Sequence, residues 1–308
     1  MKWLTALLLA LFLVLPGCSR EERTSGKLQV VTTLFPLYDF ARTIGGDKAQ
    51  VSLLLPPGVE PHSFEPRPED VVRVNRADLF VYTNAVMEPW AASMISGMDK
   101  GKTTIVEGSA GIALMQGPVS DQHRDGGGGV HAGKGKDPHV WLDFDNARTI
   151  AKNILAAYVA RDPANKAYYE GNEAKIDRQL AELDRRYKET LAQCPKKVLL
   201  HGGHYAFGYL ARRYGLTYLS ASAVDADSEP TPAKLVELVQ IMRRDRLHYV
   251  FTEELLSPRV AETIARETGA KVLMLWDGAN VTKDELQRGV TFVSLMEDDL
   301  RDLKTGLQ

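Results

Sequence analysis

Three histidines and one aspartate lie in short segments that suggest a metal site. His62 lies in EPHSF, His139 in DPHVWLD, His204 in HGGHYAFGYL and Asp277 in VLMLWD. Imidazole suits zinc, and three imidazoles with one carboxylate complete a tetrahedral shell and offset one of the two charges of the ion. Because these groups bind metal only when deprotonated, we expect affinity to fall as the pH drops through the histidine range.

Each of these residues also has an ordinary structural interpretation. A lone histidine near a strand end is usually a hydrogen-bonded polar group, and an aspartate after a strand, such as Asp277, often caps a helix. His201 precedes His204 by three residues, so it could act as an accessory ligand to the same metal. Gly202-Gly203 argues against the helical turn that this pairing would need. Spacing alone therefore leaves the four-residue site as one hypothesis among several.

The elements that must position these residues alternate along the chain. The first half predicts strands at 28–33, 51–55, 79–82 and 103–106, with helices at 37–44 and from Pro68. The second half predicts strands at 197–200, 249–252 and 272–275, with helices at 205–214, from Thr231-Pro232, and from a Ser257-Pro258 cap to Gly269. This repeated β-α-β pattern predicts an α/β fold of two lobes with mainly parallel sheets. Ligands bind beyond the carboxyl ends of such strands, so we expect the site in the cleft between the lobes.

The candidate residues agree with this placement to different degrees. His62, His204 and Asp277 each follow an expected strand, whereas no clear strand precedes His139. Three further ionisable residues flank the strand at 249–252. His248 is interpreted as structural, whereas Glu253 and Glu254 either line the cleft or lie on the surface.

A long helix is expected between the two series. After a helix at 146–160, residues 164–193 carry apolar side chains at spacings of three and four, among them Ile176, Leu180 and Leu183. About 30 helical residues make a rod of roughly 45 Å, which can bridge two lobes. The expected organisation is an N-terminal lobe at 28–162, a connecting helix at 163–193 and a C-terminal lobe at 194–308.

The N-terminal residues have the pattern of an export signal. A basic residue precedes an apolar run at 3–15, which is short for a membrane span. The string LPGC, ending at Cys18, resembles a bacterial lipobox, in which the cysteine is lipidated. We expect a signal peptide at 1–17, a linker at 18–27 and an extracytoplasmic protein, periplasmic or at the cell surface, anchored to a membrane through Cys18. The alternative is an ordinary cleaved signal with an incidental cysteine.

The composition excludes several other classes of function. The chain has 308 residues and a net charge of -2, so it has no basic field suited to nucleic acid. Its two cysteines form no C-x-x-C pair, which excludes a thiolate zinc finger, and Cys194 is interpreted as a small buried apolar residue. A glycine-rich loop at 117–137 carries His123 and His131, which form either a weak accessory metal site or part of a solvated segment.

Together these segments resemble the cluster A-I substrate-binding proteins of ABC importers for zinc and manganese, over nearly the whole mature chain. EPHSFEPRPEDV, DPHVWLDFDNA, HYAFGYLARRYGL and ETGAKVLMLWD look like the four ligand-bearing regions of that family. The resemblance assigns the ligands to His62, His139, His204 and Asp277. Phe144 replaces a proline that is usual in the second region. The resemblance also implies two lobes joined by one long rigid helix, with modest lobe tilting.

The resemblance further implies a substrate and a partner. Zinc members tend to have histidine where manganese members have glutamate at the third ligand, so His204 favours zinc as the transported substrate. Manganese, alone or with zinc, is the alternative, because some three-histidine members are described with both metals. We therefore expect a monomeric, lipid-anchored receptor that delivers zinc to an ABC permease in the cytoplasmic membrane and is not an enzyme.

Three rival functions stay open on the sequence. A secreted zinc hydrolase would use three histidines and an open position for water, although the chain has no H-E-x-x-H segment. An adhesion lipoprotein with a structural metal would unfold when that metal is removed. A binding protein for an organic solute would not call for converging histidines. The number of protein ligands and the state of the metal-free chain distinguish these functions.

Overall fold

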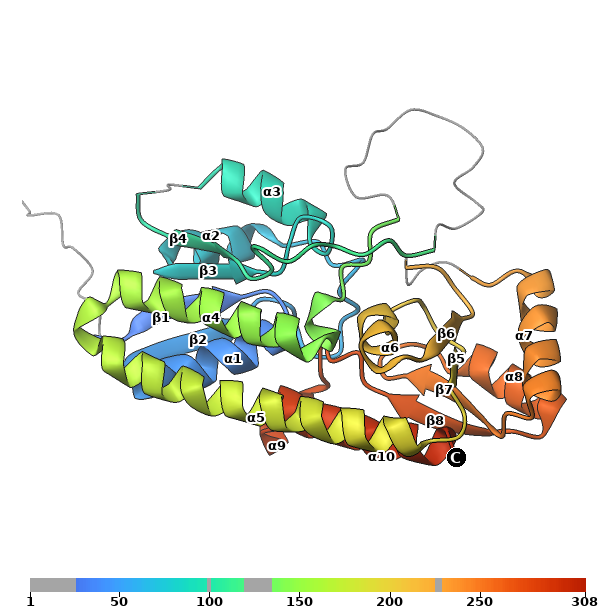
Figure 1. Cartoon of the computed structure of the whole chain (residues 1–308). Helices are drawn as coiled ribbons and strands as arrows, with labels where there is room; N and C mark the ends of the chain where they lie inside the picture. The colour runs from blue at the N-terminus through green and yellow to red at the C-terminus, as the bar shows by residue number, and fades with distance from the viewer. Residues whose placement is uncertain (1–25, 99–100, 119–134, 225–228) are drawn as a thin grey trace, which may run out of the picture.

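Two four-stranded parallel sheets, each flanked by helices, form the two lobes of the molecule (Figure 1). The computed structural model describes residues 26–98, 101–118, 135–224 and 229–308. Four expected features lie outside the described residues: the signal peptide at 1–17, Cys18, His123 and His131. Within the described part, no helix combines the length and the apolar character needed to cross a membrane.

The first sheet has the strand order β2-β1-β3-β4. Its strands are β1 (Leu28–Thr32), β2 (Ala49–Leu53), β3 (Leu79–Tyr82) and β4 (Thr104–Glu107). Its helices are α1 (Phe35–Gly45), α2 (Pro68–Arg76) and α3 (Pro89–Ser96). Central strands covered by helices on both faces are expected to be apolar throughout, and Val30, Val31 and Phe80 are buried. The four strands expected in this half are confirmed.

The second sheet repeats the arrangement in the order β6-β5-β7-β8. Its strands are β5 (Val198–His201), β6 (Thr217–Ser220), β7 (Tyr249–Glu253) and β8 (Lys271–Leu275). Its helices are α6 (Gly208–Tyr214), α7 (Pro232–Asp245) and α8 (Arg259–Thr268). Thr231 caps α7 as predicted, by accepting a hydrogen bond from the backbone of Lys234. The predicted Ser257 cap is wrong, because α8 begins at Arg259 after Pro258 without a side-chain cap.

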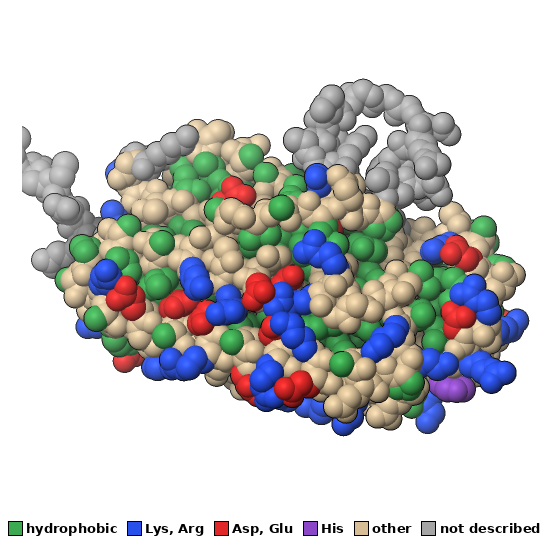
Figure 2. Space-filling view, viewed as in Figure 1, with side chains coloured by type: hydrophobic (Ala, Val, Ile, Leu, Met, Phe, Trp, Pro, Cys, Tyr) green, Lys and Arg blue, Asp and Glu red, His purple; other side chains and the backbone are tan. Residues whose placement is uncertain are grey.

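Helix α5 runs beneath both lobes and is held by one apolar face (Figure 1). It spans Lys166–Gln193, packs against α4 (Phe144–Arg161), and also contacts α1 and α10 (Phe292–Gly306). Its apolar residues are spaced by three and four and are buried: Ile176, Leu180, Leu183, Tyr187 and Leu191. On the face shown in Figure 2, acidic and basic side chains are mixed, and no field of one sign dominates this face.

The hydrophobic core is continuous between the lobes. One buried cluster includes side chains from the first sheet, such as Val30, and from the second, such as Leu199 and Phe251, together with those of α4 and α5. Two smaller clusters each lie within one lobe. Wide separation of the lobes would expose this shared core to water, so the packing favours only small relative movements.

The chain makes a second connection between the lobes after β8. The backbone N–H of Phe35 donates to Ala279 O at 2.9 Å, and that of Gly58 donates to Val281 O at 2.9 Å. Short helix α9 (Lys283–Arg288) follows, and the first turn of α10 donates from Phe292 N to the Asp39 carboxylate at 2.9 Å. Residues after 277 thus contact both lobes, and the division at 162 and 194 stays a prediction.

Candidate metal centre

The three predicted histidine ligands meet at one point. The Nε2 atom of His139 lies 3.2 Å from Nε2 of His62 and 3.2 Å from Nε2 of His204. The ligand atoms of all three side chains lie within 4.8 Å of one another. A tetrahedral zinc ion with its usual bond lengths separates neighbouring ligand atoms by roughly 3.3 Å. The spacing of the three imidazoles therefore suits one small cation.

Three separate segments bring these rings together. His62 lies in the loop after β2, where the Glu60 carboxylate accepts hydrogen bonds from the backbone of His62 and Ser63 at 3.0 and 2.9 Å. His139 directly precedes a short 3-10 helix at Val140–Leu142 and is fully buried. His204 lies in the loop between β5 and α6 and is 2% exposed. Each histidine is thus placed by the local structure of its own segment.

A carboxylate lies next to the Nδ1 atom of His139, and another lies next to the Nδ1 atom of His204. Asp137 Oδ1 lies 2.8 Å from Nδ1 of His139, and Glu253 Oε2 lies 2.5 Å from Nδ1 of His204. Glu253 Oε1 also accepts from the backbone N–H of His204 at 2.9 Å. A carboxylate at Nδ1 favours the proton there and leaves the Nε2 lone pair available to a metal.

The surroundings of His139 and His204 shift the pKa values of these two rings in opposite directions. Burial, reinforced by the neighbouring His204 and His62, lowers the pKa of His139 well below its usual value. Burial also disfavours the charged form of His204, but the charge of Glu253 outweighs it and raises the pKa of His204 to about 9. Near neutral pH, His139 is therefore a neutral ligand, whereas His204 must release a proton to bind a cation.

Asp277, the predicted fourth ligand, belongs to an adjoining acidic group. Its carboxylate lies within 4.8 Å of the ligand atoms of His204 and Glu253, and it accepts from the backbone of Ala279 at 2.8 Å. Glu254 accepts from the backbone N–H of Asp277 at 3.2 Å, and burial together with Asp277 raises the pKa of Glu254 well above its usual value. Asp277 thus belongs to a second group of possible ligands, which shares His204 with the three-histidine group. Its role as a ligand stays a prediction.

The remaining sequence candidates are placed differently. His201 is buried, and it belongs to neither of the two groups of described residues that could hold a metal ion. Its Nδ1 lies 3.1 Å from the carbonyl oxygen of His204. Residues 202–207 form a loop, which agrees with the glycine pair at 202–203, but the helix predicted from residue 205 begins only at Gly208. Glu253 and Glu254 are buried beside the centre, and His248 is exposed at the opposite end of β7. A signal for the contact between Glu253 and His204 was available, because β5 and β7 are neighbouring parallel strands whose carboxyl ends lie side by side. Glu253 ends β7, and His204 follows the end of β5.

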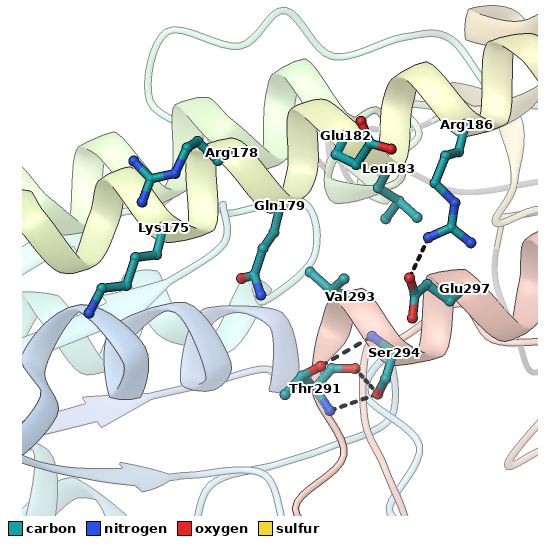
Figure 3. A pocket seen from close by; sticks show the side chains of 10 residues that line it. All are labelled: Lys175, Arg178, Gln179, Glu182, Leu183, Arg186, Thr291, Val293, Ser294 and Glu297. Atoms are coloured by element: carbon teal, nitrogen blue, oxygen red, sulfur yellow. Dashed lines mark hydrogen bonds and ion pairs between the residues drawn. The ribbon is translucent and has the colours of Figure 1, made fainter.

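A larger hollow lies away from the histidines. A groove of about 640 Å³ lies between α5 and α10. Figure 3 shows polar and charged side chains that line it, such as Lys175, Arg178 and Gln179. The Arg186–Glu297 ion pair, at 2.5 Å, lies along this groove. Its described lining contains no histidine. A bare metal ion needs converging ligand atoms and not a large volume, so we place the candidate site at the histidines.

Asn280 ties the His62 loop to the segment after Asp277. Its fully buried side chain donates to Pro56 O and to Val59 O, both at 2.8 Å. We expect Asn280→Ala to lower the free energy of unfolding by about 1–3 kcal/mol, because two buried carbonyls lose their donor. It should also weaken metal binding, since the loop before His62 becomes less ordered.

Chemical denaturation and metal titration of the Asn280→Ala variant measure these two effects. Asn75→Ala is the matched control, because the Asn75 amide donates to Val71 O within its own helix, α2. Equal stability and affinity in the Asn280 variant and the Asn75 variant would contradict the role given to Asn280.

Comparison with known proteins adds independent information. A family model described as zinc-uptake complex component A, periplasmic, matches residues 30–306. The high-affinity zinc uptake system protein ZnuA of Bacillus subtilis is 37% identical over 304 residues, covering 97% of this chain and 95% of that protein. The zinc-binding lipoprotein AdcA of Streptococcus pneumoniae is 35% identical over 303 residues, covering 98% of this chain but only 60% of AdcA.

Solved structures agree with the fold. The metal-dependent lipoprotein YcdH from Bacillus subtilis is 37% identical and superposes with a TM-score of 0.78, covering 92% of this chain and 100% of that one. The Zn(II)-bound ZnuA-like domain of Streptococcus pneumoniae AdcA is 33% identical with a TM-score of 0.77, covering 92% and 99%. The laminin-binding protein Lmb of Streptococcus agalactiae, described as having adhesin and metal-transporting activity, is 28% identical with a TM-score of 0.79, covering 92% and 100%.

Proposed function

Because this chain belongs to the family of periplasmic zinc-uptake component A proteins, we propose that it captures one zinc ion outside the cytoplasm and delivers it to the permease of an ABC importer. The observation that carries this proposal is the convergence of three imidazole Nε2 atoms from separate segments. Nε2 of His139 lies 3.2 Å from Nε2 of each of the other two histidines. Zinc-uptake and zinc-binding relatives that cover nearly the whole chain support the same substrate.

The proposed ligands are His62, His139 and His204, with Asp277 as the fourth. Three imidazoles favour zinc over manganese, because carboxylate, carbonyl and water oxygens are the ligands that suit manganese. The buried carboxylates near His204 offset the charge of the ion. Manganese, alone or together with zinc, is the alternative substrate.

We propose binding and release without catalysis. Catalytic zinc usually keeps three protein ligands and an open position for water, whereas a fourth carboxylate would close the shell. A structural metal in an adhesion protein is the other alternative. The large apolar core shared by both lobes supports a metal-free chain that stays folded, which that alternative does not predict.

The receptor is proposed to act as an extracytoplasmic monomer. Residues 1–17 would direct export, lipidated Cys18 would anchor the chain to a membrane, and residues 18–27 would form the linker to the lobes. The lobes at 28–162 and 194–308 would tilt only modestly about the helix at 163–193. The continuous core supports this limited movement.

Titration of residues 19–308 with zinc, followed by competition with manganese, tests the proposal. We expect one tight zinc equivalent, weaker manganese and a folded metal-free chain, measured by calorimetry and circular dichroism. Tight manganese with weak zinc would change the substrate but keep the receptor class. The absence of stoichiometric binding of either metal would rule out the histidine site and the proposed function together.

A further inference from the structure

Two ligand histidines of the proposed zinc site each depend on one buried carboxylate. Glu253 is 5% exposed and contacts both the ring and the backbone of His204. Asp137 is fully buried, contacts Nδ1 of His139 and accepts from the backbone of His139 at 3.0 Å. Among the described residues, neither carboxylate forms an ion pair with a lysine or arginine. Their position is therefore determined mainly by the histidines and by the space around them.

The space for Glu253 depends on the missing side chain of Gly203. A Cβ atom on residue 203 would lie 1.8 Å from Oε1 of Glu253, 2.8 Å from its Cδ, and 2.7 Å from Cε1 of His201. Because both Glu253 oxygens already contact His204, the carboxylate cannot move aside without losing those contacts. The φ angle of Gly203 is not in the left-handed region, so its backbone alone does not require glycine.

A second glycine has the same relation to Asp137. A Cβ atom on Gly208, the first residue of α6, would lie 2.7 Å from Oδ2 of Asp137 and 2.7 Å from the Tyr205 hydroxyl. Gly202 is different, because a Cβ there would meet the backbone of Ala261 on α8 at 2.7 Å. Gly202 thus allows a helix to pack closely, whereas Gly203 in the loop and Gly208 at the start of α6 leave room for the carboxylates that contact the histidines.

We propose that Gly203 and Gly208 are positioning residues for zinc capture, each preserving the space from which a carboxylate orients a ligand histidine. The inference rests on the proposed function, because it concerns the geometry of the same site. A carboxylate behind an imidazole fixes the ring and increases its basicity as a ligand, and its loss typically weakens metal affinity by about 10–100-fold. Gly203 acts through Glu253 on His204, and Gly208 acts through Asp137 on His139.

A double-mutant cycle on Gly203 and Glu253 tests this inference. Zinc dissociation constants are measured by competition with a chelator for the unchanged chain, Gly203→Ala, Glu253→Ala and the double variant, all as residues 19–308. We expect each single variant to weaken zinc by about 10–100-fold. We expect the double variant to bind within about 3-fold of Glu253→Ala, because the new methyl group then meets no carboxylate.

Two glycine variants separate positioning from general loss of stability. Gly202→Ala should lower the unfolding temperature of the metal-free chain through its contact with α8, yet bind zinc within about 3-fold of the unchanged chain. Gly171→Ala, on α5 with no atom within 4 Å of its added Cβ, should leave zinc affinity unchanged. It should raise the unfolding temperature slightly, because alanine is favoured over glycine in a helix interior. The visible spectrum of bound Co(II) should change in Gly203→Ala and in Glu253→Ala but not in these controls.

The outcomes distinguish this inference from the function on which it rests. An unchanged chain that binds no zinc overturns the proposed function, and the inference with it. An unchanged chain that binds zinc, with Gly203→Ala equally tight, overturns the inference alone. If the double variant loses zinc affinity by the product of the two single-variant losses, the inference is also overturned. Residue 203 would then act through another group, such as His201.

Discussion

Replacing His139 with alanine is expected to weaken zinc binding by at least about 100-fold, more than the loss of a supporting carboxylate typically costs. His139 is central in the cluster, because its Nε2 lies 3.2 Å from the Nε2 atoms of both His62 and His204. Its lowered pKa also keeps this ring neutral, and so able to bind a cation, at neutral pH. Without it, the two remaining imidazoles cannot complete the proposed shell.

The His139→Ala chain should stay folded without metal. The ring contributes one buried hydrogen-bonded contact with Asp137, whose loss costs about 1–3 kcal/mol. Asp137 can take up a proton when its partner is absent, because burial raises its pKa to about 7. Calorimetric zinc titration beside circular dichroism measures affinity and folding separately. His248→Ala, at an exposed site just before β7, is the control, and equal zinc affinity in the two variants would contradict the assignment of His139.

Replacing Arg213 with methionine is expected to lower the free energy of unfolding by about 3–5 kcal/mol. Arg213 lies on α6 with its side chain 11% exposed, and it connects α6 to α5 and to the start of α4. Its guanidinium contacts Asp184 on α5 at 2.6 Å and Asp143, which caps α4, at 2.7 Å. Removing the cation leaves these partly buried carboxylates close together without a counter-charge.

Arg185→Met is the matched control for Arg213→Met. Arg185 also lies between two carboxylates, Glu182 and Glu189, but on the exposed side of α5. Exposed ion pairs contribute little, so this variant should unfold almost like the unchanged chain. Denaturant titrations of both variants measure the difference. Equal midpoints for Arg213→Met and Arg185→Met would contradict the view that Arg213 fastens the lobes to α5.

The pH dependence of stability provides a second check on Arg213. Burial opposes ionisation of Asp184, but Arg213, Lys188 and Tyr214 outweigh it and lower its pKa to about 2. A carboxyl whose pKa falls on folding stabilises the folded state above its unfolded pKa of about 4. That contribution is lost as the pH falls from about 4 towards 2. The stability difference between the unchanged chain and Arg213→Met should therefore narrow as the pH falls over this range.

Local sequence patterns predicted most of the elements that carry the site. Apolar β-branched runs bounded by proline, glycine or charged residues identified the strands next to His62, His204 and Asp277. β6 was missed because TYLS is short and half polar, and it lies at the edge of its sheet. α10 was missed because its acidic residues obscure the apolar face that packs on α5.

The site was predicted as far as local motifs extend. His62 and His204 were found from their positions after strands, whereas His139 was found from its motif alone. A resemblance that covers whole segments supported all three. The support for His204 could not be found this way, because Glu253 is 49 residues away and reaches His204 only through the pairing of β5 with β7. The space left by Gly203 likewise becomes apparent only when the two strand ends are placed side by side.

Crystallography of the zinc-loaded chain, with anomalous diffraction at the zinc edge, tests the central claim most directly. We expect one strong anomalous peak about 2.0–2.1 Å from the Nε2 atoms of His62, His139 and His204. A carboxylate oxygen of Asp277 at a similar distance would complete the shell. A peak at other residues, or no peak in a chain saturated with zinc, would contradict the account.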